Sequence, residues 1–464
     1  MRFPIGLTLI AAAVAVAIVL VAGSYLVNPD RSLLPSAQFY PETISPNADG
    51  IDDITELSYE VTRNADVTVI LTSTTDSSEY LFRDNQRRSP EEYSVLFSGV
   101  VDGFILPGEE IAGDVLRRLI PNDEYTWTLR AVAQDDGEVA EISGTLTVED
   151  GDSPLPEMTS FEISPDDFTP NQDGVTDRAM INVFLTKDAY LLVYLLSDTG
   201  ERIYVTRREQ GRELGEEGRQ SFDYDGGVDI GADPPPDGTY TVVAEAQDDE
   251  GQVTQRSGEI TIRAGGKPRA EIVGQPTGVD VVFVTMPYDD AYYSELDGLG
   301  DLVPMPDTPG SLSNVAVTMP VGDLLVFKLT VYNYGIAPIR TTGPWPGAVY
   351  EQRQVGASLG YYEQSGAWRV GIQCETSAES YPWRWAIGSP DDLYTETDPA
   401  NGNVYYYLPP GERTEVWGAI RMTELVDARN PQACWAGLIH EDVEISLQNS
   451  NVGRREVELA AVGD

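Results

Sequence analysis

Two short segments of the chain are dense in oxygen atoms that could bind a metal ion. Both read Ser/Thr-Pro-Asn-x-Asp-Gly-Ile/Val-x-Asp, over residues 45–53 and 169–177. Calcium prefers about six to eight oxygen ligands, and glycine lets a loop fold back tightly enough to gather them. The candidate calcium ligands are Asn47, Asp49, Asp52 and Asp53 in the first loop and Asn171, Asp173 and Asp177 in the second.

The same residues have a second interpretation that needs no ion. Asn and Asp side chains cap turns by bonding their own backbone, and Asp-Gly is a strong turn dipeptide. No Glu closes either segment into an EF-hand loop, which spans about 12 residues. The sequence therefore leaves calcium binding and turn formation as alternatives for both loops.

The elements that must position these loops are repeated as well. Residues 121–137 and 143–148 resemble residues 236–251 and 257–262. Apolar and polar residues alternate along residues 125–133 and 240–246, and Gly, Asp and Pro bound these runs, which predicts half-buried strands joined by hairpins. The repeat is as long as a whole domain and far longer than a solenoid repeat. We therefore expect two related β-domains.

The loops, the Phe-Asp-Tyr-Asp-Gly segment at 222–226 and the Pro-Asp-Gly-Thr-Tyr turn at 236–240 resemble the bacterial Ig-like β-sandwich family of the flagellar hook-cap protein. The resemblance covers residues 37–265. It implies one sandwich over residues 37–150 and another over 160–265, acting as spacers, adhesive units or display platforms, and it implies no particular activity.

The first copy departs from this pattern. It carries an insertion, residues 102–119, in which we expect residues 109–119 to form one or two helical turns. It also has Asn-Asp-Glu at 122–124 where the second copy has Asp-Gly-Thr.

The remaining chain predicts a third β-domain. Residues 266–312 are expected to form a linker and a first strand, and residues 313–464 a β-sandwich. Residues 329–335 and 408–412 loosely resemble cell-adhesion-related bacterial Ig-like domains. Cys374 and Cys434 are the only cysteines, and in an exported chain we expect them to form one disulfide.

Aromatic residues concentrate in this third region. Trp383 and Trp385 alternate in a predicted strand and so share one face, where they could stack on sugars beside Asp391 and Asp392. Aromatic side chains are also ordinary core filling in β-proteins. A ligand platform and core packing are therefore both open for this pair.

An apolar run at the N-terminus predicts the location of the protein. Residues 5–27, within an N-terminal segment of residues 1–28, hold no charge and are long enough to cross a bilayer core of about 30 Å. Arg2 precedes the run, which favours a cytoplasmic N-terminus with the remainder outside the cell.

Two other interpretations of this run remain. A signal peptide could be cleaved near residues 22–24. Residues 6–10 resemble the cleavage site of type IV pilin-like proteins, although Ala11 stands where such helices usually carry a glutamate. The pilin-like interpretation implies a filament subunit.

The net charge of −46 excludes nucleic acid and anionic membrane surfaces as partners, because both would be repelled. The sole histidine, His440, is expected at the surface or at a strand end, without a metal-binding partner. Because this one histidine has no partner for catalysis or metal binding, the sequence predicts a protein that is not an enzyme.

These observations predict an all-β protein of tandem Ig-like sandwiches behind one N-terminal transmembrane helix. We expect a cell-surface stalk, adhesin or scaffold with calcium as a candidate stiffening ion. The expected partners are other surface proteins or polysaccharide. A pilus-like filament or homo-oligomer and a carbohydrate-binding surface protein are the alternatives.

Overall fold

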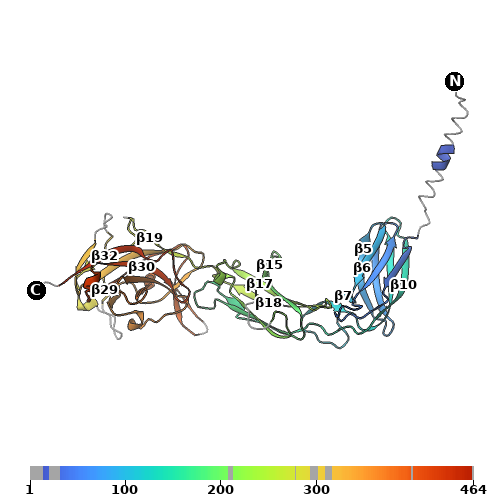
Figure 1. Ribbon diagram of the computed structural model, residues 1–464, viewed down its shortest axis with the longest axis horizontal. Coiled ribbons are helices and arrows are strands. Elements are labelled where there is room, and N and C mark those ends of the chain that lie inside the picture. The colour runs from blue at the N-terminus through green and yellow to red at the C-terminus, as the bar shows by residue number, and fades with distance from the viewer. Residues whose placement is uncertain are drawn as a thin grey trace, which may run out of the picture.

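The computed structural model describes residues 14–19, 32–206, 213–276, 278–292, 301–308, 316–398 and 401–461. Residues 14–19 are helical, and the rest of the described chain is built of β-strands and short 3-10 helices, so the protein is all-β. Three β-domains follow one another in a row, with the first set at an angle to the other two (Figure 1). The 3-10 helices are η1 (Val228–Ile230), η2 (Asp290–Tyr292), η3 (Gly356–Leu359), η4 (Pro390–Asp392) and η5 (Asp427–Arg429).

The first domain is a sandwich of a three-stranded sheet, in the order β1-β3-β6, and a five-stranded sheet, in the order β2-β10-β9-β4-β5. Along β4 every second residue is buried, as the alternating sequence requires when one face of a sheet packs on a core. The strands are β1 (Ser36–Tyr40), β2 (Thr43–Ile44), β3 (Thr55–Val61), β4 (Ala65–Ser73), β5 (Glu79–Arg88), β6 (Glu91–Phe97), β9 (Asp123–Ala133) and β10 (Val139–Val148).

The second domain repeats this arrangement. A three-stranded sheet, β11-β13-β16, faces a second sheet in which β15, β14, β17 and β18 are neighbours and β12 pairs with β18. The strands are β11 (Met158–Ser164), β12 (Asp167–Phe168), β13 (Ala179–Leu185), β14 (Tyr190–Leu196), β15 (Arg202–Tyr204), β16 (Gly218–Tyr224), β17 (Gly238–Gln247) and β18 (Val253–Ile262).

The two domains share details beyond strand order. The short parallel pairs β2 with β10 and β12 with β18 are equivalent. Tyr125 donates a hydrogen bond of 2.6 Å to Pro121 O, and Tyr240 donates one of 2.7 Å to Pro236 O. A tyrosine that bonds back to the backbone just upstream is a recurring corner of Ig-like sandwiches. The repeated sequence thus folds into repeated structure.

The insertion in the first domain is not helical. It contains β7 (Val100–Asp102) and β8 (Asp114–Leu119), which pair with each other. β8 also pairs with β18, so the hairpin extends the larger sheet of the second domain. The helical prediction for residues 109–119 was wrong because pairing with a strand far along the chain overrides local propensity.

The third domain has a five-stranded sheet and a nine-stranded sheet around the largest core of the molecule. The strands are β19 (Ala270–Val273), β20 (Val282–Met286), β21 (Val317–Pro320), β22 (Leu324–Asn333), β23 (Ile339–Thr341), β24 (Val349–Glu351), β25 (Trp368–Cys374), β26 (Trp383–Ala386), β27 (Tyr394–Thr397), β28 (Val404–Leu408), β29 (Arg413–Arg421), β30 (Gln432–His440), β31 (Glu444–Ile445) and β32 (Val452–Ala460).

The segment predicted as a linker belongs to this domain. β19 and β20 both pair with β22, so residues 270–286 supply two strands of its five-stranded sheet. The first strand predicted in residues 266–312 corresponds to β20, whereas β19 was not predicted.

The predicted disulfide is confirmed. Cys374 on β25 and Cys434 on β30 are opposite each other in an antiparallel pair and are joined by a disulfide across a Cα–Cα distance of 4.0 Å. Both cysteines are fully buried in the core of the third domain.

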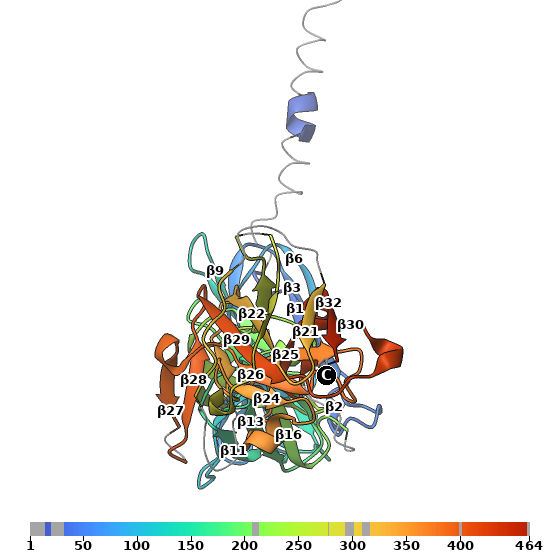
Figure 2. The same ribbon diagram turned by 90° about the vertical axis from the view of Figure 1, so that its left-hand side faces the viewer.

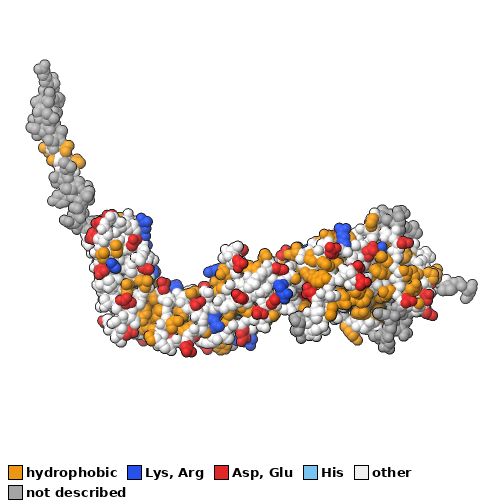
Figure 3. Space-filling model, turned by 180° about the vertical axis from the view of Figure 1, so that it is seen from behind, with side chains coloured by type: hydrophobic (Ala, Val, Ile, Leu, Met, Phe, Trp, Pro, Cys, Tyr) orange, Lys and Arg blue, Asp and Glu red, His pale blue; other side chains and the backbone are white. Residues whose placement is uncertain are grey.

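The molecule is elongated. Seen along its long axis, the domains lie one behind another (Figure 2). Acidic side chains are scattered over all three domains on the face shown in Figure 3. No helix among the described residues is long and apolar enough to cross a bilayer. The predicted anchor, residues 5–27, lies outside the described residues except for residues 14–19.

Candidate functional site

The two repeated loops that sequence analysis selected as candidate calcium sites lie at the joints between domains. Each repeated loop joins the opening short strand of its domain to the next, longer strand. The first loop accepts a hydrogen bond at Pro46 O from Asp152 N of the interdomain segment, and the second contacts Tyr407 of the third domain through Asp173. The two joints are therefore the candidate functional sites.

The first joint combines strand pairing with a buried amide. Val253 on β18 is opposite Arg117 on β8, and Gln255 is opposite Asp114. The side chain of Gln252 is fully buried, and its Oε1 accepts a hydrogen bond of 3.2 Å from Leu119 N. Its Nε2 donates to Asp152 O at 3.1 Å and to Pro154 O at 3.0 Å. One side chain thus ties the hairpin and the interdomain segment to the second domain.

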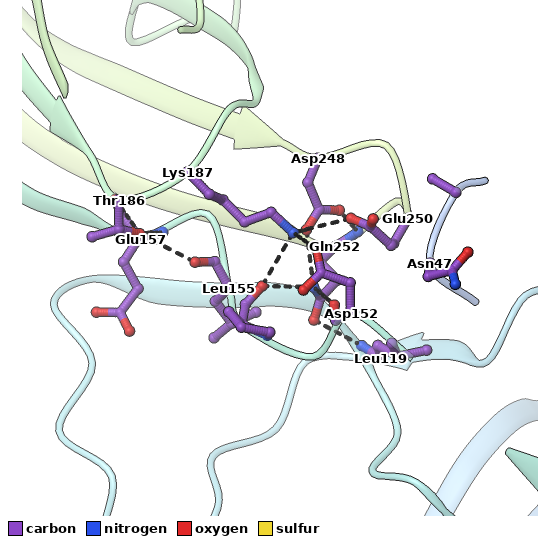
Figure 4. A network of polar contacts seen from close by, with 12 residues as sticks. Asn47, Leu119, Asp152, Leu155, Glu157, Thr186, Lys187, Asp248, Glu250 and Gln252 are labelled. Atoms are coloured by element: carbon purple, nitrogen blue, oxygen red, sulfur yellow. Dashed lines mark hydrogen bonds and ion pairs between the residues drawn. The ribbon is translucent and has the colours of Figure 1, made fainter. Parts of the chain in front are cut away.

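A lysine occupies the centre of the same joint (Figure 4). Lys187 Nζ lies 2.8 Å from Asp152 Oδ2, 3.1 Å from Asp248 Oδ2 and 3.1 Å from Glu250 Oε2. Burial acts to lower the pKa of Lys187, but its bonds to Asp152 and Asp248 prevail and raise the pKa. The ammonium therefore stays charged and forms ion pairs with Asp248 and Glu250, whose side chains are 1% and 6% exposed.

The first loop uses its oxygens to hold its own backbone. Asp53 Oδ1 accepts hydrogen bonds from the N–H groups of Asn47 and Ala48, and Asp53 Oδ2 accepts one from Gly50. Asn47 Oδ1 accepts from Asp49 N. These contacts are those of a turn, and most of the loop is exposed.

The second loop has the same internal bonds and is additionally docked on the third domain. Asp177 accepts from the N–H groups of Asp173 and Gly174, and Asn171 Oδ1 accepts from Asp173 N. Tyr407 donates a hydrogen bond of 2.9 Å to Asp173 Oδ2. Asn171 and Asp173 are 1% and 4% exposed. The third domain thus covers the loop.

Two more contacts complete this second joint. His440 Nε2 lies 2.8 Å from Gln172 O, and its ring stacks on Trp368 at 4.5 Å between ring centroids. The backbones of Gly174 and Ser365 approach so closely that a Cβ on Gly174 would lie 2.2 Å from Ser365 O. His440 is only 3% exposed, so the expectation of a surface histidine was wrong, although it does end strand β30.

Burial makes the second joint electrostatically unusual. Burial, followed by repulsion from Asp177, raises the pKa of Asp173 to about 7. Burial lowers the pKa of His440 to about 4. The third domain also supplies Arg340, which is 5% exposed and whose positive charge acts to lower the pKa of both Asp173 and Asp177.

The described residues contain no group of three or more His, Cys, Asp or Glu side chains arranged to hold a metal ion. In both loops the carboxylate and amide oxygens face backbone N–H groups at hydrogen-bonding distance. This arrangement fits turn formation better than a calcium shell, and calcium binding stays a prediction.

The tryptophan pair does not form a ligand platform. Trp383 and Trp385 are 2% and 0% exposed and belong to the core of the third domain. Trp385 Nε1 donates to Ala348 O at 3.0 Å, and its ring packs edge-on against Phe327 and Tyr350. Both rings fill the space between the two sheets, so core packing was the correct alternative.

Sequence analysis did not identify Lys187, Gln252, Tyr407 or Arg340. Their partners lie in distant segments, so no local motif marks them. The one usable signal was the scarcity of lysine, because Lys187 is the only lysine in residues 160–265.

No family model and no curated protein match the chain. Solved structures to which it is similar include a tetra-tandem repeat from the extending region of a large adhesion protein, with 12% identity, a TM-score of 0.19, and coverage of 92% of this chain and 75% of that chain. A bacterial ice-binding adhesin of 1.5 MDa, described for host cell surface retention, gives 10% identity, a TM-score of 0.19, and coverage of 93% and 98%. The D00-D0 domain of intimin gives 11% identity, a TM-score of 0.14, and coverage of 49% and 100%.

These similarities are distant. At such identities and TM-scores they carry no conclusion about what this chain binds, and the resemblance to the hook-cap family has no matching family model.

Proposed function

We propose that the chain is an extracytoplasmic stalk that holds its third domain at a fixed distance and angle from the membrane in which its N-terminal segment is anchored. The observation that carries this proposal is the construction of the two joints. Flexible tandem domains are linked by exposed, polar segments with few contacts. Here each boundary is bridged by buried side chains instead.

The first joint resists bending because it is bridged in two independent ways. β8 continues the sheet of the second domain, and separating the domains would break this ladder. Separation would also break the ion pair of Lys187 with Asp152 and the hydrogen bonds of the buried Gln252 side chain with Leu119 N and Asp152 O. A buried polar group that loses its partner is costly.

The second joint resists bending through a buried surface on each side. The third domain buries Asn171 and Asp173, and it contributes the hydroxyl of Tyr407 and the ring of His440 to the loop. A buried polar group that loses its partner costs about 1–3 kcal/mol. Several such groups would lose their partners together if the joint opened.

The chemistry of the chain supports an extracytoplasmic location. A disulfide is stable outside the cytoplasm and rare within it. The net charge of −46 keeps an exposed rod soluble and repels anionic surfaces. As a stalk, the protein would present its third domain to another surface protein or a neutral polymer, as an adhesin or a scaffold does.

Electron microscopy of the native protein in its own membrane tests this proposal. We expect single rods of one length that project from the bilayer. Long filaments built from many copies would contradict the stalk and support the pilus-like alternative instead.

A further inference from the structure

The edge of β18 in the second domain is occupied by a strand from outside that domain. Asp248 N donates to Gln252 O, which makes residues 248 and 252 a hydrogen-bonded pair of the β17–β18 hairpin. Such pairs alternate with non-bonded pairs, so the N–H and C=O groups of Val253 and Gln255 point away from β17. They point toward β8, whose residues Arg117 and Asp114 are their partners.

The equivalent edge in the first domain has the same geometry, and no strand of the described part of the chain pairs with it. Ala133 N donates to Glu138 O, so the backbone groups of Val139 and Glu141 point away from β9 in the same way. On that side β10 pairs only with β2, at Thr147 and Val148, among the described residues.

The two equivalent valines at the start of these edges differ in their exposed fraction. Val139 is 48% exposed, whereas its counterpart Val253 is 6% exposed. Unpaired edge strands are templates for the addition of another strand. In the second domain, β8 covers the edge of β18 that is equivalent to this edge of β10.

We propose that the outer edge of β10, residues 139–143, accepts an antiparallel extended segment of a partner protein, as β18 accepts β8. Strand addition supplies main-chain hydrogen bonds, and the side chains around the edge set specificity. This interaction surface is separate from the proposed stalk function and does not depend on it.

The surroundings of the edge indicate the chemistry of the partner. The carboxylates of Asp135, Asp136, Glu138 and Glu141 surround the edge, and only Arg63 and Arg130 are paired with them. The strand that binds the equivalent edge, β8, reads Asp-Val-Leu-Arg-Arg-Leu, so Arg117 and Arg118 outnumber its one acid, Asp114. The partner segment is therefore basic, with interspersed apolar residues.

A second copy of this chain is a poorer occupant. Each copy carries a net charge of −46, which repels another copy, and its β8 already pairs with its own β18.

Disulfide exchange with a synthetic peptide tests the site on the full chain. The protein carries Val139→Cys, and its two natural cysteines are already paired and buried. The probe is the peptide of residues 111–120 with Arg117→Cys, the position that faces Val253 in the second domain. The control peptide carries Arg118→Cys instead, which keeps the same net charge and places the thiol on the opposite face of the strand.

We expect at least a tenfold excess of the adduct with the Arg117→Cys peptide over the control, measured by intact mass at equilibrium. Adding Glu141→Pro removes an outward N–H and should abolish this preference. Proline is tolerated on an edge strand where the N–H faces solvent, so circular dichroism should show an unchanged fold. Glu141→Gln keeps the N–H and should retain the preference.

Equal adduct from both peptides would overturn the proposal, and so would a preference that survives Glu141→Pro. A concentration-dependent dimer of the unmodified chain that is lost in Glu141→Pro would overturn the basic partner and assign the edge to a second copy.

Discussion

Single side chains fix how the domains of this protein meet. Lys187 and Gln252 hold the first joint, and Asp173, Tyr407 and His440 hold the second. The sequence marked Asp173 as a candidate calcium ligand and gave His440 no special role, and the contacts that explain both come from the neighbouring domain. The sequence around a residue predicts the turn that the residue forms. It does not predict a hydrogen-bond partner more than 200 positions away.

Replacing Lys187 with methionine should destabilise the protein. Lys187→Met keeps the length of the side chain and leaves Asp248 and Glu250 buried without a cation. We expect the free energy of unfolding to fall by about 2–4 kcal/mol, below the full cost of breaking a buried pair because Lys187 is partly exposed. Urea denaturation measures the change.

Arg263→Met is the matched control. It removes an exposed pair with Asp167, whose side chains are 64% and 44% exposed, and should cost no more than about 1 kcal/mol. Equal losses in the two variants would contradict the role of Lys187.

Asp173 should make stability depend on pH. Its folded pKa is about 7 and an unfolded Asp titrates near pH 3.9, so between about pH 4 and pH 7 the folded state holds a proton that the unfolded state lacks. Its contribution to stability therefore falls as pH rises through this window. We expect Asp173→Asn to exceed the wild type in free energy of unfolding by about 2–4 kcal/mol at pH 8 and to match it near pH 4.

His440 acts in the opposite sense but is present in both proteins, so its effect cancels in this difference. Urea denaturation from pH 4 to pH 8 gives the comparison, with Asp49→Asn in the exposed first loop as the control. A difference between Asp173→Asn and wild type that does not change with pH would refute the account.

Chelation tests the calcium prediction for both loops. Because the oxygens of Asp53 and Asp177 already accept backbone hydrogen bonds, we expect the same melting temperature in excess EGTA and in millimolar calcium. Differential scanning calorimetry measures it. A rise of several degrees with calcium would assign the loops an ion after all.

At the scale of elements, the sequence predicted what lies within a domain and missed what lies between domains. The alternation along residues 125–133 and 240–246 correctly marked β9 and β17, because period two follows from burying one face of a strand. The hairpin β7–β8 was missed since β8 finds its partner strand in the next domain. β19 was missed within the third domain, because its partner β22 lies about 60 residues further along.

Replacing glycine with alanine should destabilise the second loop more than the first. Gly50 and Gly174 have φ angles of 85° and 79°, so alanine meets the same backbone strain at each. A Cβ at Gly50 meets nothing within 4 Å, whereas one at Gly174 meets Ser365 O at 2.2 Å. We expect Gly50→Ala to cost about 1 kcal/mol and Gly174→Ala to cost more and also loosen the second joint.

Limited proteolysis between the second and third domains, together with melting temperature, measures both effects. Equal costs and equal protease resistance in the two variants would show that the loop is not a docking element.

At the scale of the whole molecule, the three β-domains form one bent rod (Figures 1 and 3). We propose that the two joints make this rod stiff. Composition and charge indicated a β-rich exported protein, and the repeat indicated two of the domains. The proposed stiffness could not be predicted from the sequence, because it rests on contacts that exist only after the separate domains have folded and met.

Negative-stain electron microscopy of single particles tests this central claim most directly, through the distribution of the angle between the first and third domains. We predict one elongated shape with a narrow distribution of angles, unchanged in EGTA and broadened by Lys187→Met. A string of three domains with widely scattered angles in the wild type would contradict the account.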